Sequence, residues 1–577
     1  MLQRPKEKPL PPASQTEARR RRAGAKGHTP DPEVLRQVQA LLGDRLRRPD
    51  LLIEHLHLIQ DEYGYIGTAQ MVALASELRL STAEVFEVAS FYHHFDTPQP
   101  GQLPPPPLTV RVCDSISCAL QGAEQLLTNL QLVLGDGVRM QRVPCVGRCQ
   151  DAPVAVVGSN PVAPADVERV AALVAAKSTE APLPDCRGYY EYRSEGGYVL
   201  LQKLDAGSPA ASEDVLRLLD EAKLRGLGGA GFPAGRKWRI LQAQPAPRLL
   251  AVNIDEGEPG TFKDRYFLER DPHRLLEGAL IAARVVGIAE VYIYLRDEYA
   301  GIRAMLEREL DLLRSDPPCQ LPPIHLRRGA GAYICGEESA MIESIEGRRG
   351  MPRLRPPYVA EIGLFGRPTL AHNMETLYWV RDLLERGPEW FAGRGRHSRS
   401  GLRAFSVSGR VRRTGVHLAP AGITLRELID EYCGGMVDGH RLYAYLPGGA
   451  SGGILPASLA DVPLDFDTLQ RYGCFIGSAA IIVLSQHDSA REAALNVMRF
   501  FAHESCGQCT PCRVGTAKAA MLMETPKWNQ PLLQELAEVM VDASICGLGQ
   551  AAANPMRSVM KYFPHELEPD RQPDSPA

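Results

Sequence analysis

The chain has 577 residues, which is about four times the length of an ordinary domain of roughly 150 residues, so a single compact domain is excluded. Its 65 Lys and Arg residues nearly balance 69 Asp and Glu residues, and 44% of the residues are hydrophobic, which excludes a disordered chain and a general nucleic-acid binder. The most apolar stretch, 278–295, is interrupted by Arg284 and Glu290, so we expect no membrane span.

The N-terminal segment is basic. Residues 1–30 carry eight Lys and Arg side chains against two Glu side chains, and a disordered basic tail is predicted over 1–31. A targeting peptide or a docking arm for an acidic partner is the alternative. The segment lacks the apolar core of a signal peptide, and the thirteen cysteines of the chain are odd in number and clustered. We therefore expect a reducing, cytoplasmic compartment.

Two small domains are predicted next. Apolar residues recur at helical spacing over 32–100, which predicts a helical bundle that ends at the prolines of 98–107. The second domain, 104–178, combines predicted strands at 108–112 and 155–157 with predicted helices at 123–134 and 164–176. This alternation indicates a compact α/β fold.

The rest of the chain divides into a linker and three further domains. Residues 179–205 are predicted to be the linker. An α/β domain follows over 206–400, with strands expected at 249–252, 291–295 and 324–326. Residues 402–486 contain short strands, Gly-Pro turns and one helix at 425–432, residues 487–566 are helical, and 567–577 form a tail. The predicted fold class is therefore multidomain α/β.

A first cysteine set lies near the C-terminus. Three cysteines recur at three-residue steps and a fourth follows a helical segment: Cys506, Cys509, Cys512 and Cys546. Structural zinc prefers two separated cysteine pairs, whereas three thiolates in tandem plus a distant one match the ligands of a cubane iron-sulfur cluster. A four-iron cluster is favoured over zinc, and the neighbouring glycines 507, 547 and 549 would allow backbone N–H groups to approach it.

A second cysteine set lies in the first α/β domain and consists of Cys113, Cys118, Cys145 and Cys149. Four converging thiolates would suit zinc or a two-iron cluster, and the cluster is favoured only modestly. The presence of both sets in one chain favours electron transfer. The five other cysteines lack comparable spacing and are expected to be buried or incidental thiols.

Three polar loops indicate one shared pocket. The first, 226–238, holds five glycines and ends with Arg236 and Lys237, but it follows a helical pattern, so the usual strand-loop-helix dinucleotide motif is not met and a structural turn is the alternative. The others are 253–260, after a predicted strand, and 329–338, before a helix. Backbone N–H groups and Lys237 would bind a phosphate, while Asn253 and the carboxylates would bond sugar hydroxyls.

These motifs resemble the flavin subunit of NAD-linked dehydrogenases related to the soluble arm of respiratory complex I, with the thioredoxin-like two-iron subunit fused in front. The resemblance covers about 32–566 and rests on Arg-Gly-Leu-Gly-Gly-Ala-Gly-Phe-Pro, Asp-Glu-Gly-Glu-Pro-Gly-Thr-Phe-Lys-Asp, Gly-Ala-Tyr-Ile-Cys-Gly-Glu-Glu and Glu-Ser-Cys-Gly-Gln-Cys-Thr-Pro-Cys-Arg. Two segments, 50–61 and 446–456, resemble the beta subunit of molybdenum- or tungsten-dependent NAD-linked formate dehydrogenase most closely.

The resemblance implies a Rossmann-like FMN domain, a ubiquitin-like β-grasp (SLBB) domain at 402–486 and a helical four-iron domain at 487–566. It also assigns cofactor residues. FMN would be bound by Gly226, Gly228, Lys237, Asn253, Asp255, Glu256, Tyr333, Gly336, Glu337 and Asn373, and NAD by Phe232, Glu258, Glu338, Arg355 and Tyr358. Cys506, Cys509, Cys512 and Cys546 would ligate a 4Fe-4S cluster, and Cys113, Cys118, Cys145 and Cys149 a 2Fe-2S cluster. The chain differs from the family at His372, where the family has Asn, and keeps a cation and an aromatic ring in Arg355-Pro-Pro-Tyr358.

The function implied by the resemblance is NAD+ reduction: electrons from a partner would pass through the clusters to FMN and leave as a hydride. The partner would be a molybdenum- or tungsten-pterin alpha subunit with further iron-sulfur clusters, in a hetero-oligomer that binds neither nucleic acid nor membrane. Two alternatives are the diaphorase subunit of an NAD-reducing hydrogenase or a complex I flavoprotein, and an iron-sulfur scaffold without flavin. No residue is assigned an acid-base role.

Overall fold

The computed structural model describes residues 28–99, 101–205 and 209–567, so the predicted tails lie almost wholly outside the described residues. The chain divides into two compact units at Pro105 and Pro106. Among the described residues, no helix has the length and apolarity needed to cross a membrane.

The first unit is helical, as the apolar spacing predicts. Its elements are α2 (Pro32–Leu42), the short 3-10 helix η1 (Pro49–Leu51), α3 (Leu52–Tyr63), α4 (Thr68–Leu78) and α5 (Thr82–Ala89). Polar caps fix the helix ends: the Asp31 carboxylate accepts the N–H groups of Glu33 and Val34, and Ser81 and Glu84 form a capping box at α5. The buried apolar faces, with Val38, Leu56 and Leu74 among them, pack together as the core.

The second unit begins with a four-stranded sheet in the order β2-β1-β3-β4. Its strands are β1 (Thr109–Cys113), β2 (Arg139–Val143), β3 (Ala155–Val157) and β4 (Asn160–Val162). β1 pairs with β2 in parallel and with β3 in antiparallel orientation. The helices α6 (Ile116–Leu120), α7 (Ala123–Leu134) and α8 (Val167–Ala175) complete this part, and Val110, Leu130 and Val170 are fully buried in its core.

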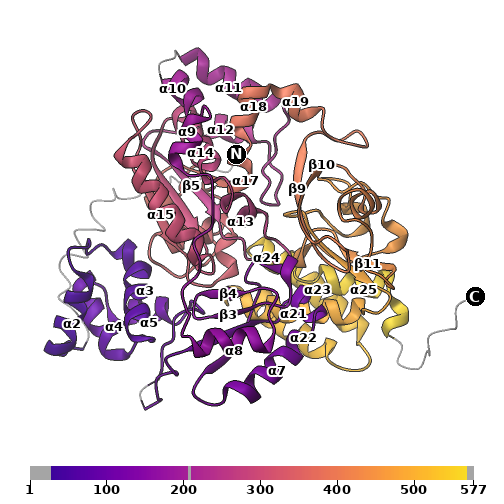
Figure 1. Cartoon of the computed structure of the whole chain (residues 1–577), viewed down its shortest axis with the longest axis horizontal. Coiled ribbons are helices and arrows are strands. Elements are labelled where there is room, and N and C mark those ends of the chain that lie inside the picture. The colour runs from indigo at the N-terminus through magenta and orange to yellow at the C-terminus, as the bar shows by residue number, and fades with distance from the viewer. Residues whose placement is uncertain (1–27, 100, 206–208, 568–577) are drawn as a thin grey trace, which may run out of the picture. The chain divides into compact units, whose positions relative to one another are not determined.

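The central sheet in the chain order of the second unit is parallel and has the order β7-β6-β5-β8; Figure 1 labels its strand β5. Its strands are β5 (Arg248–Ile254), β6 (Ile288–Leu295), β7 (Ile324–Arg328) and β8 (Thr369–Asn373). The longer helices around it are α11 (Pro209–Glu221), α12 (Ala234–Gln242), α14 (Pro272–Val286), α15 (Ala300–Ser315) and α16 (Glu338–Ile345), and the shorter ones are α13 (Lys263–Leu268), α17 (Met374–Tyr378), α18 (Val380–Arg386) and α19 (Pro388–Ala392). The three predicted strands lie within β5, β6 and β7, whereas no sequence pattern indicated β8.

The predicted linker 179–205 is not simply extended, because it contains α9 (Tyr189–Ser194) and α10 (Val199–Asp205). Three buried tyrosines of this segment pack around His273 of α14: Tyr189, Tyr192 and Tyr198. The Tyr198 hydroxyl lies 2.8 Å from His273 Nδ1, and His273 Nε2 lies 2.9 Å from Glu309 Oε2. These contacts fasten the segment to the helical layer of the central sheet.

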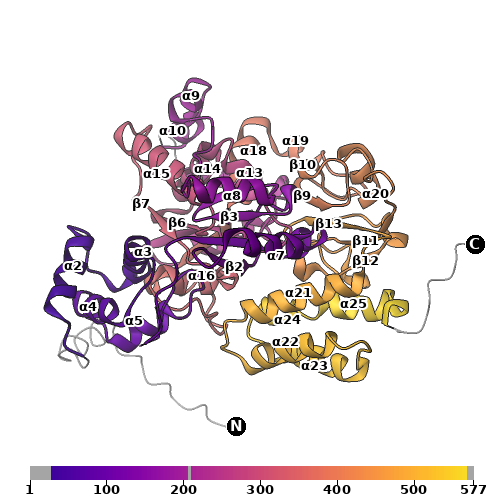
Figure 2. The same cartoon turned by 60° about the horizontal axis from the view of Figure 1, so that its bottom comes forward.

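A third sheet has the order β10-β9-β13-β11-β12, with β9 (Leu402–Gly409) and β13 (Ala480–Ser485) parallel to each other. The other strands are β10 (Gly415–Pro420), β11 (Leu442–Leu446) and β12 (Leu455–Pro456), and the predicted helix is present as α20 (Leu425–Glu427) continued by a π-helical turn over Leu428–Tyr432. The C-terminal helices are α21 (Ala490–Glu504), α22 (Thr510–Met523), α23 (Gln530–Ala543), α24 (Gly547–Ala551) and α25 (Asn554–Tyr562). Figure 2 shows α25 beside β11 and β12, with α22 and α23 as an outer layer.

Candidate cofactor sites

The three polar loops of the sequence meet at the carboxyl edge of the parallel sheet, where ligands of open α/β sheets bind. Asn253, near the end of β5, donates from Nδ2 to the Gly336 carbonyl oxygen at 2.9 Å and accepts the Asp255 N–H at 2.9 Å. A Cβ on Gly228 would lie 2.8 Å from Asn373 Cβ, so only glycine allows this approach. The loops 226–238, 253–260 and 329–338 therefore line one site.

Asp255 offers this site a buried acceptor for a hydrogen-bond donor of a ligand. Its Oδ2 is buried and has no hydrogen-bond partner among the described residues, and burial raises the pKa of its carboxyl well above the ordinary value. A buried polar atom without a partner costs about 1–3 kcal/mol. A hydroxyl or ring N–H of FMN is a donor of the kind that Asp255 lacks, so the residues fit this cofactor.

Cations and carboxylates gather at the start of α16. Lys237 Nζ donates to the Ala371 carbonyl oxygen at 2.7 Å and lies 3.4 Å from Glu338 Oε2. Glu337 caps the helix by accepting the N–H groups of Ser339 and Ala340 at 2.9 and 3.0 Å. Arg355 forms an ion pair with Glu337 and lies 3.3 Å from Glu338 Oε1. A phosphate entering here would meet two cations that carboxylates already orient.

The loop around Glu258 is held by two distant parts of the chain. The Tyr333 hydroxyl donates to one oxygen of Glu258, and the N–H and Oγ of Ser451 both donate to the other at 2.7 Å. The Tyr333 N–H donates to Glu504 Oε2 at 2.9 Å. Ser451, which follows β11, bonds Glu258 directly. Glu504, at the end of α21, bonds Tyr333, which in turn bonds Glu258. The third sheet and the C-terminal helices therefore both help to position Glu258. Two aromatic rings remain available for stacking, since Phe232 is 39% and Tyr358 56% exposed.

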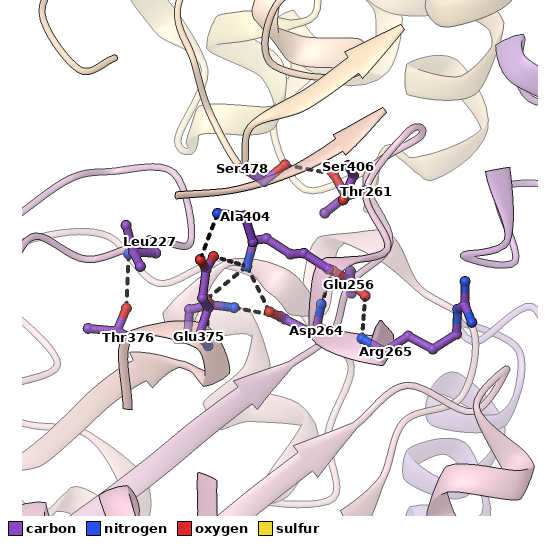
Figure 3. A network of polar contacts seen from close by, with 12 residues as sticks. Leu227, Glu256, Thr261, Asp264, Arg265, Glu375, Thr376, Ala404, Ser406 and Ser478 are labelled. Atoms are coloured by element: carbon purple, nitrogen blue, oxygen red, sulfur yellow. Dashed lines mark hydrogen bonds and ion pairs between the residues drawn. The ribbon is translucent and has the colours of Figure 1, made fainter. Parts of the chain in front are cut away.

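A set of buried charges around Asp264 and Glu375 is not predicted by any sequence pattern (Figure 3). Lys263 Nζ lies 2.7 Å from Asp264 Oδ1 and 3.1 Å from Glu375 Oε2, and Asn373 donates to Asp264 Oδ2 at 2.7 Å. The available signal was the run Thr261-Phe-Lys-Asp-Arg265, in which three adjacent charges follow a buried strand and its loop. These charges orient Asn373.

The Glu256 carboxylate forms its hydrogen bonds with groups of the protein itself. Its carboxylate accepts the N–H groups of Asp264 and Arg265 at 2.8 and 3.1 Å and the Tyr299 hydroxyl at 2.9 Å. Burial, followed by the neighbouring Asp264 charge, raises the pKa of Glu256 to about 7. The carboxylate thus fixes the start of α13, and the FMN contact expected of Glu256 stays a prediction.

His372, the departure from the family pattern, is buried. Its Nε2 accepts the Trp238 indole N–H at 2.8 Å. Burial, with a smaller effect of Lys237, lowers the pKa of His372 well below its ordinary value, so the ring is neutral. Its role in the structure is to join α12 to β8.

The N-terminal cysteine set forms a closed, buried four-thiol site. Cys113, Cys118, Cys145 and Cys149 are free and buried, and Cys145 Sγ lies 3.2 Å from Cys149 Sγ. Cys113 is in hydrogen-bond contact with both Cys118 and Cys145, and the Gly147 N–H points to Cys145 Sγ at 3.4 Å. Hydrogen bonds among these cysteines lower the pKa of Cys145 well below its ordinary value and raise the pKa of Cys113 and Cys149 well above it. This arrangement fits a cluster with four thiolate ligands.

The C-terminal set converges at the starts of α22 and α24. Cys509 caps α22, Cys512 lies in its first turn, and Cys546 caps α24. Burial raises the pKa of Cys512 to about 11 and of Cys546 to about 12, while the Leu548 and Gly549 N–H groups donate to Cys546. A Cβ on Gly549 would lie 2.9 Å from Cys512 Cβ. Converging thiols with backbone donors fit the ligand set of an anionic cluster.

Four family models match the chain. They are the Nuo51 FMN-binding domain (219–382), the NADH-ubiquinone oxidoreductase-F iron-sulfur binding region (492–570), the thioredoxin-like [2Fe-2S] ferredoxin (38–178) and the SLBB domain (405–455). The chain therefore carries an FMN-binding domain and both kinds of iron-sulfur domain, as predicted. The zinc alternatives are not supported by these matches.

Curated relatives match about two thirds of the chain. The NADH-quinone oxidoreductase F 2 subunit of Rhizobium meliloti is 39% identical over 400 residues, which cover 67% of this chain and 94% of the relative. The NADH-quinone oxidoreductase F subunit of Aquifex aeolicus is 39% identical, and the match covers 68% of this chain and 93% of the relative. The mitochondrial NADH-ubiquinone oxidoreductase 51 kDa subunit of Neurospora crassa is 41% identical, and the match covers 60% of this chain and 74% of the relative.

A solved structure matches nearly the whole chain. The air-oxidized NAD+-reducing [NiFe]-hydrogenase contains a chain that is 31% identical, with a TM-score of 0.78, and the match covers 93% of this chain and 96% of that chain. Its H2-reduced form gives a TM-score of 0.79 at the same identity. At this coverage the likeness extends over both the N-terminal cysteine set and the flavin-binding part.

Proposed function

Because the chain belongs to the family of NADH-quinone oxidoreductase F subunits, we propose that it is the flavoprotein subunit that exchanges electrons between NAD(H) and one-electron carriers of a larger assembly. The observation that carries this proposal is the presence, in one unit, of a sheet edge with an available buried acceptor and two four-thiol sites. Bound FMN supplies the link between hydride and single-electron chemistry.

We assign FMN to the residues that line the sheet edge: Gly226, Gly228, Lys237, Asn253, Asp255, Glu256, Tyr333, Gly336, Glu337 and Asn373. Asp255 accepts a donor of the cofactor, and the Asn253 bond to the Gly336 carbonyl holds two of the loops together. Gly228 keeps the space beside Asn373 open. The protein's part is to bind and orient, so no side chain is given a proton-transfer role.

The nicotinamide dinucleotide is assigned to the more exposed rim of the same site. Phe232 and Tyr358 present rings for stacking, Arg355 and the Glu338 carboxylate supply polar contacts, and Glu258 belongs to the rim. Since Tyr333 and Ser451 occupy both oxygens of Glu258, this residue shapes the rim through its fixed position.

The candidate that we favour as electron donor is a hydrogenase-type partner subunit in a hetero-oligomer. The observation that favours it is the likeness to a hydrogenase chain over both the two-iron and the flavin parts. The formate-oxidising molybdenum or tungsten partner, which the sequence favoured, rests on the resemblance of segments 50–61 and 446–456 and is placed second. The relatives from Rhizobium and Aquifex support a third partner, an NADH-quinone oxidoreductase assembly.

The deciding experiment uses the native assembly. Nickel, molybdenum and tungsten are measured in the purified complex, and NAD+ reduction is assayed with hydrogen and with formate. Nickel with hydrogen-dependent NADH formation supports the first partner, whereas molybdenum or tungsten with formate-dependent NADH formation supports the second. A preparation without flavin absorbance and without NADH-dye activity would contradict the flavoprotein proposal and favour the iron-sulfur scaffold.

A further inference from the structure

Buried arginines of the flavin-binding part hold the loop that carries two ligands of the N-terminal cysteine set. Arg296, directly after β6, donates from Nη2 to the Cys145 carbonyl oxygen at 2.6 Å. Arg265, in α13, donates from Nε to the Gly147 carbonyl oxygen at 2.8 Å and from Nη2 to Gln150 Oε1 at 2.8 Å. The loop 145–150 is thus bonded to two cations from outside its own domain.

The same loop is shaped to receive these contacts. Gly147 has a φ of +72°, and a Cβ at this position would collide with the Tyr299 hydroxyl. That hydroxyl donates to the Glu256 carboxylate, and Arg296 also donates from Nη1 to the Glu256 carbonyl oxygen. Arg296 therefore bonds a ligand residue of the cysteine set and a loop residue of the flavin site at the same time.

The charge of Arg296 acts from a buried position. Its side chain is 4% exposed, and it forms an ion pair with Glu298, with Nη2 2.7 Å from Oε1 and Nε 3.0 Å from Oε2. Charges in such surroundings interact more strongly than on the surface and are little screened by salt. A cluster ligated by four thiolates is anionic and gains one negative charge on reduction, so a buried cation beside it favours the reduced form.

We propose that Arg296 is a positioning residue that fixes the Cys145 loop against the flavin site and raises the reduction potential of the two-iron cluster, with Glu298 moderating this effect. The proposal concerns the two-iron domain and needs the proposed function only for its consequence in electron transfer. Arg296 acts on the cluster through the loop that it holds and through its charge.

The test is an EPR-monitored redox titration of the two-iron cluster in the purified full chain, with iron and labile sulfide measured in each preparation. Arg296→Gln is expected to shift the reduction equilibrium at least tenfold toward the oxidised form, which is about 59 mV toward negative potential for one electron. Arg296→Lys keeps the charge and is expected to give less than half of that shift. A shift below threefold, or a positive one, in cluster-loaded Arg296→Gln overturns the proposal.

Glu298→Gln separates the effect of the Arg296 charge on the potential from an effect of a loosened Cys145 loop. It removes the carboxylate that partly neutralises Arg296, so the potential is expected to rise, whereas a merely structural role would not give opposite signs in the two variants. If Arg296→Gln does not retain iron, Glu298→Gln decides: a positive shift supports the proposal and no shift or a negative one overturns it. Arg314→Gln, on the exposed side of α15, is the matched control and should leave the potential unchanged.

The proposed flavoprotein function and the proposed role of Arg296 can be refuted independently of each other. The potential of the two-iron cluster is measured without NAD(H), so it can be determined even where flavin content and NADH-dye activity contradict the proposed function. Conversely, normal NADH-dye activity with an unchanged potential in the variants would refute the role of Arg296 alone.

Discussion

Replacement of Lys263 by Met should destabilise the second unit strongly. The Lys263 side chain is 1% exposed, and its ammonium lies 2.7 Å from Asp264 Oδ1, 3.1 Å from Glu375 Oε2 and 3.1 Å from Asn373 Oδ1. Both carboxylates are also buried, so the change would leave two negative charges without their cation. Removing one partner of a buried ion pair costs about 3–5 kcal/mol, and we expect a loss of that size in the free energy of unfolding.

A smaller effect is expected on FMN. Asn373 would lose the Lys263 contact but keep its bond to Asp264, so at most about one hydrogen bond's worth of positioning is lost, roughly 0.5–1.5 kcal/mol or up to about tenfold in the dissociation constant. Urea unfolding followed by circular dichroism measures the stability, and flavin fluorescence measures the affinity. Lys518→Met, at an exposed position of α22, is the control.

A double substitution tests whether uncompensated charge causes the loss. Glu375→Gln added to Lys263→Met should recover part of the lost stability, because it removes one of the two uncompensated charges. If Lys263→Met unfolds within about 1 kcal/mol of Lys518→Met, or if the second substitution adds its own full loss, the buried charges do not stabilise the unit as we infer.

Three other outcomes are expected. Cys509→Ser should abolish the four-iron EPR signal and uncouple NAD+ from the partner while leaving part of the NADH-dye activity; full coupling in this variant would contradict the ligand assignment. Gly147→Ala should lower iron content, because its Cβ would collide with Tyr299; normal iron content would show that the loop adapts. Burial raises the pKa of Glu309, but hydrogen bonds from His273, the Tyr189 N–H and Arg308 outweigh this effect and lower the pKa to about 2. The stabilisation by Glu309 is therefore full above pH 4.5 and is lost as pH falls toward 2. Urea midpoints should therefore show a larger deficit for Glu309→Gln at pH 7 than at pH 3.

Local patterns predicted the parts of the fold that depend on neighbouring residues. The run 291–295 is buried on both faces and lies within β6, and the cysteine spacings bring each set of four together. No sequence pattern indicates β8, because it ends in His372 and Asn373, whose polar partners lie on other elements. The sequence predicts only a linker over 179–205, because the tyrosines of this segment meet their partner, His273, only in the folded unit.

The missed charges have the same physical cause. A buried Lys or Arg is tolerated only with partners. Asp264 and Glu298 are close in sequence to Lys263 and Arg296, but the contacts that join separate elements are distant: Lys263 meets Glu375, and Arg296 meets the Cys145 carbonyl. No short window of sequence around Lys263 or Arg296 contains these distant groups. The Arg296 contact joins the flavin edge to the two-iron loop, and the Lys263–Glu375 pair joins it to α17, directly after β8. Stability and cofactor geometry therefore depend on the same residues, which is why substitutions at these positions are expected to change unfolding energy together with affinity or potential.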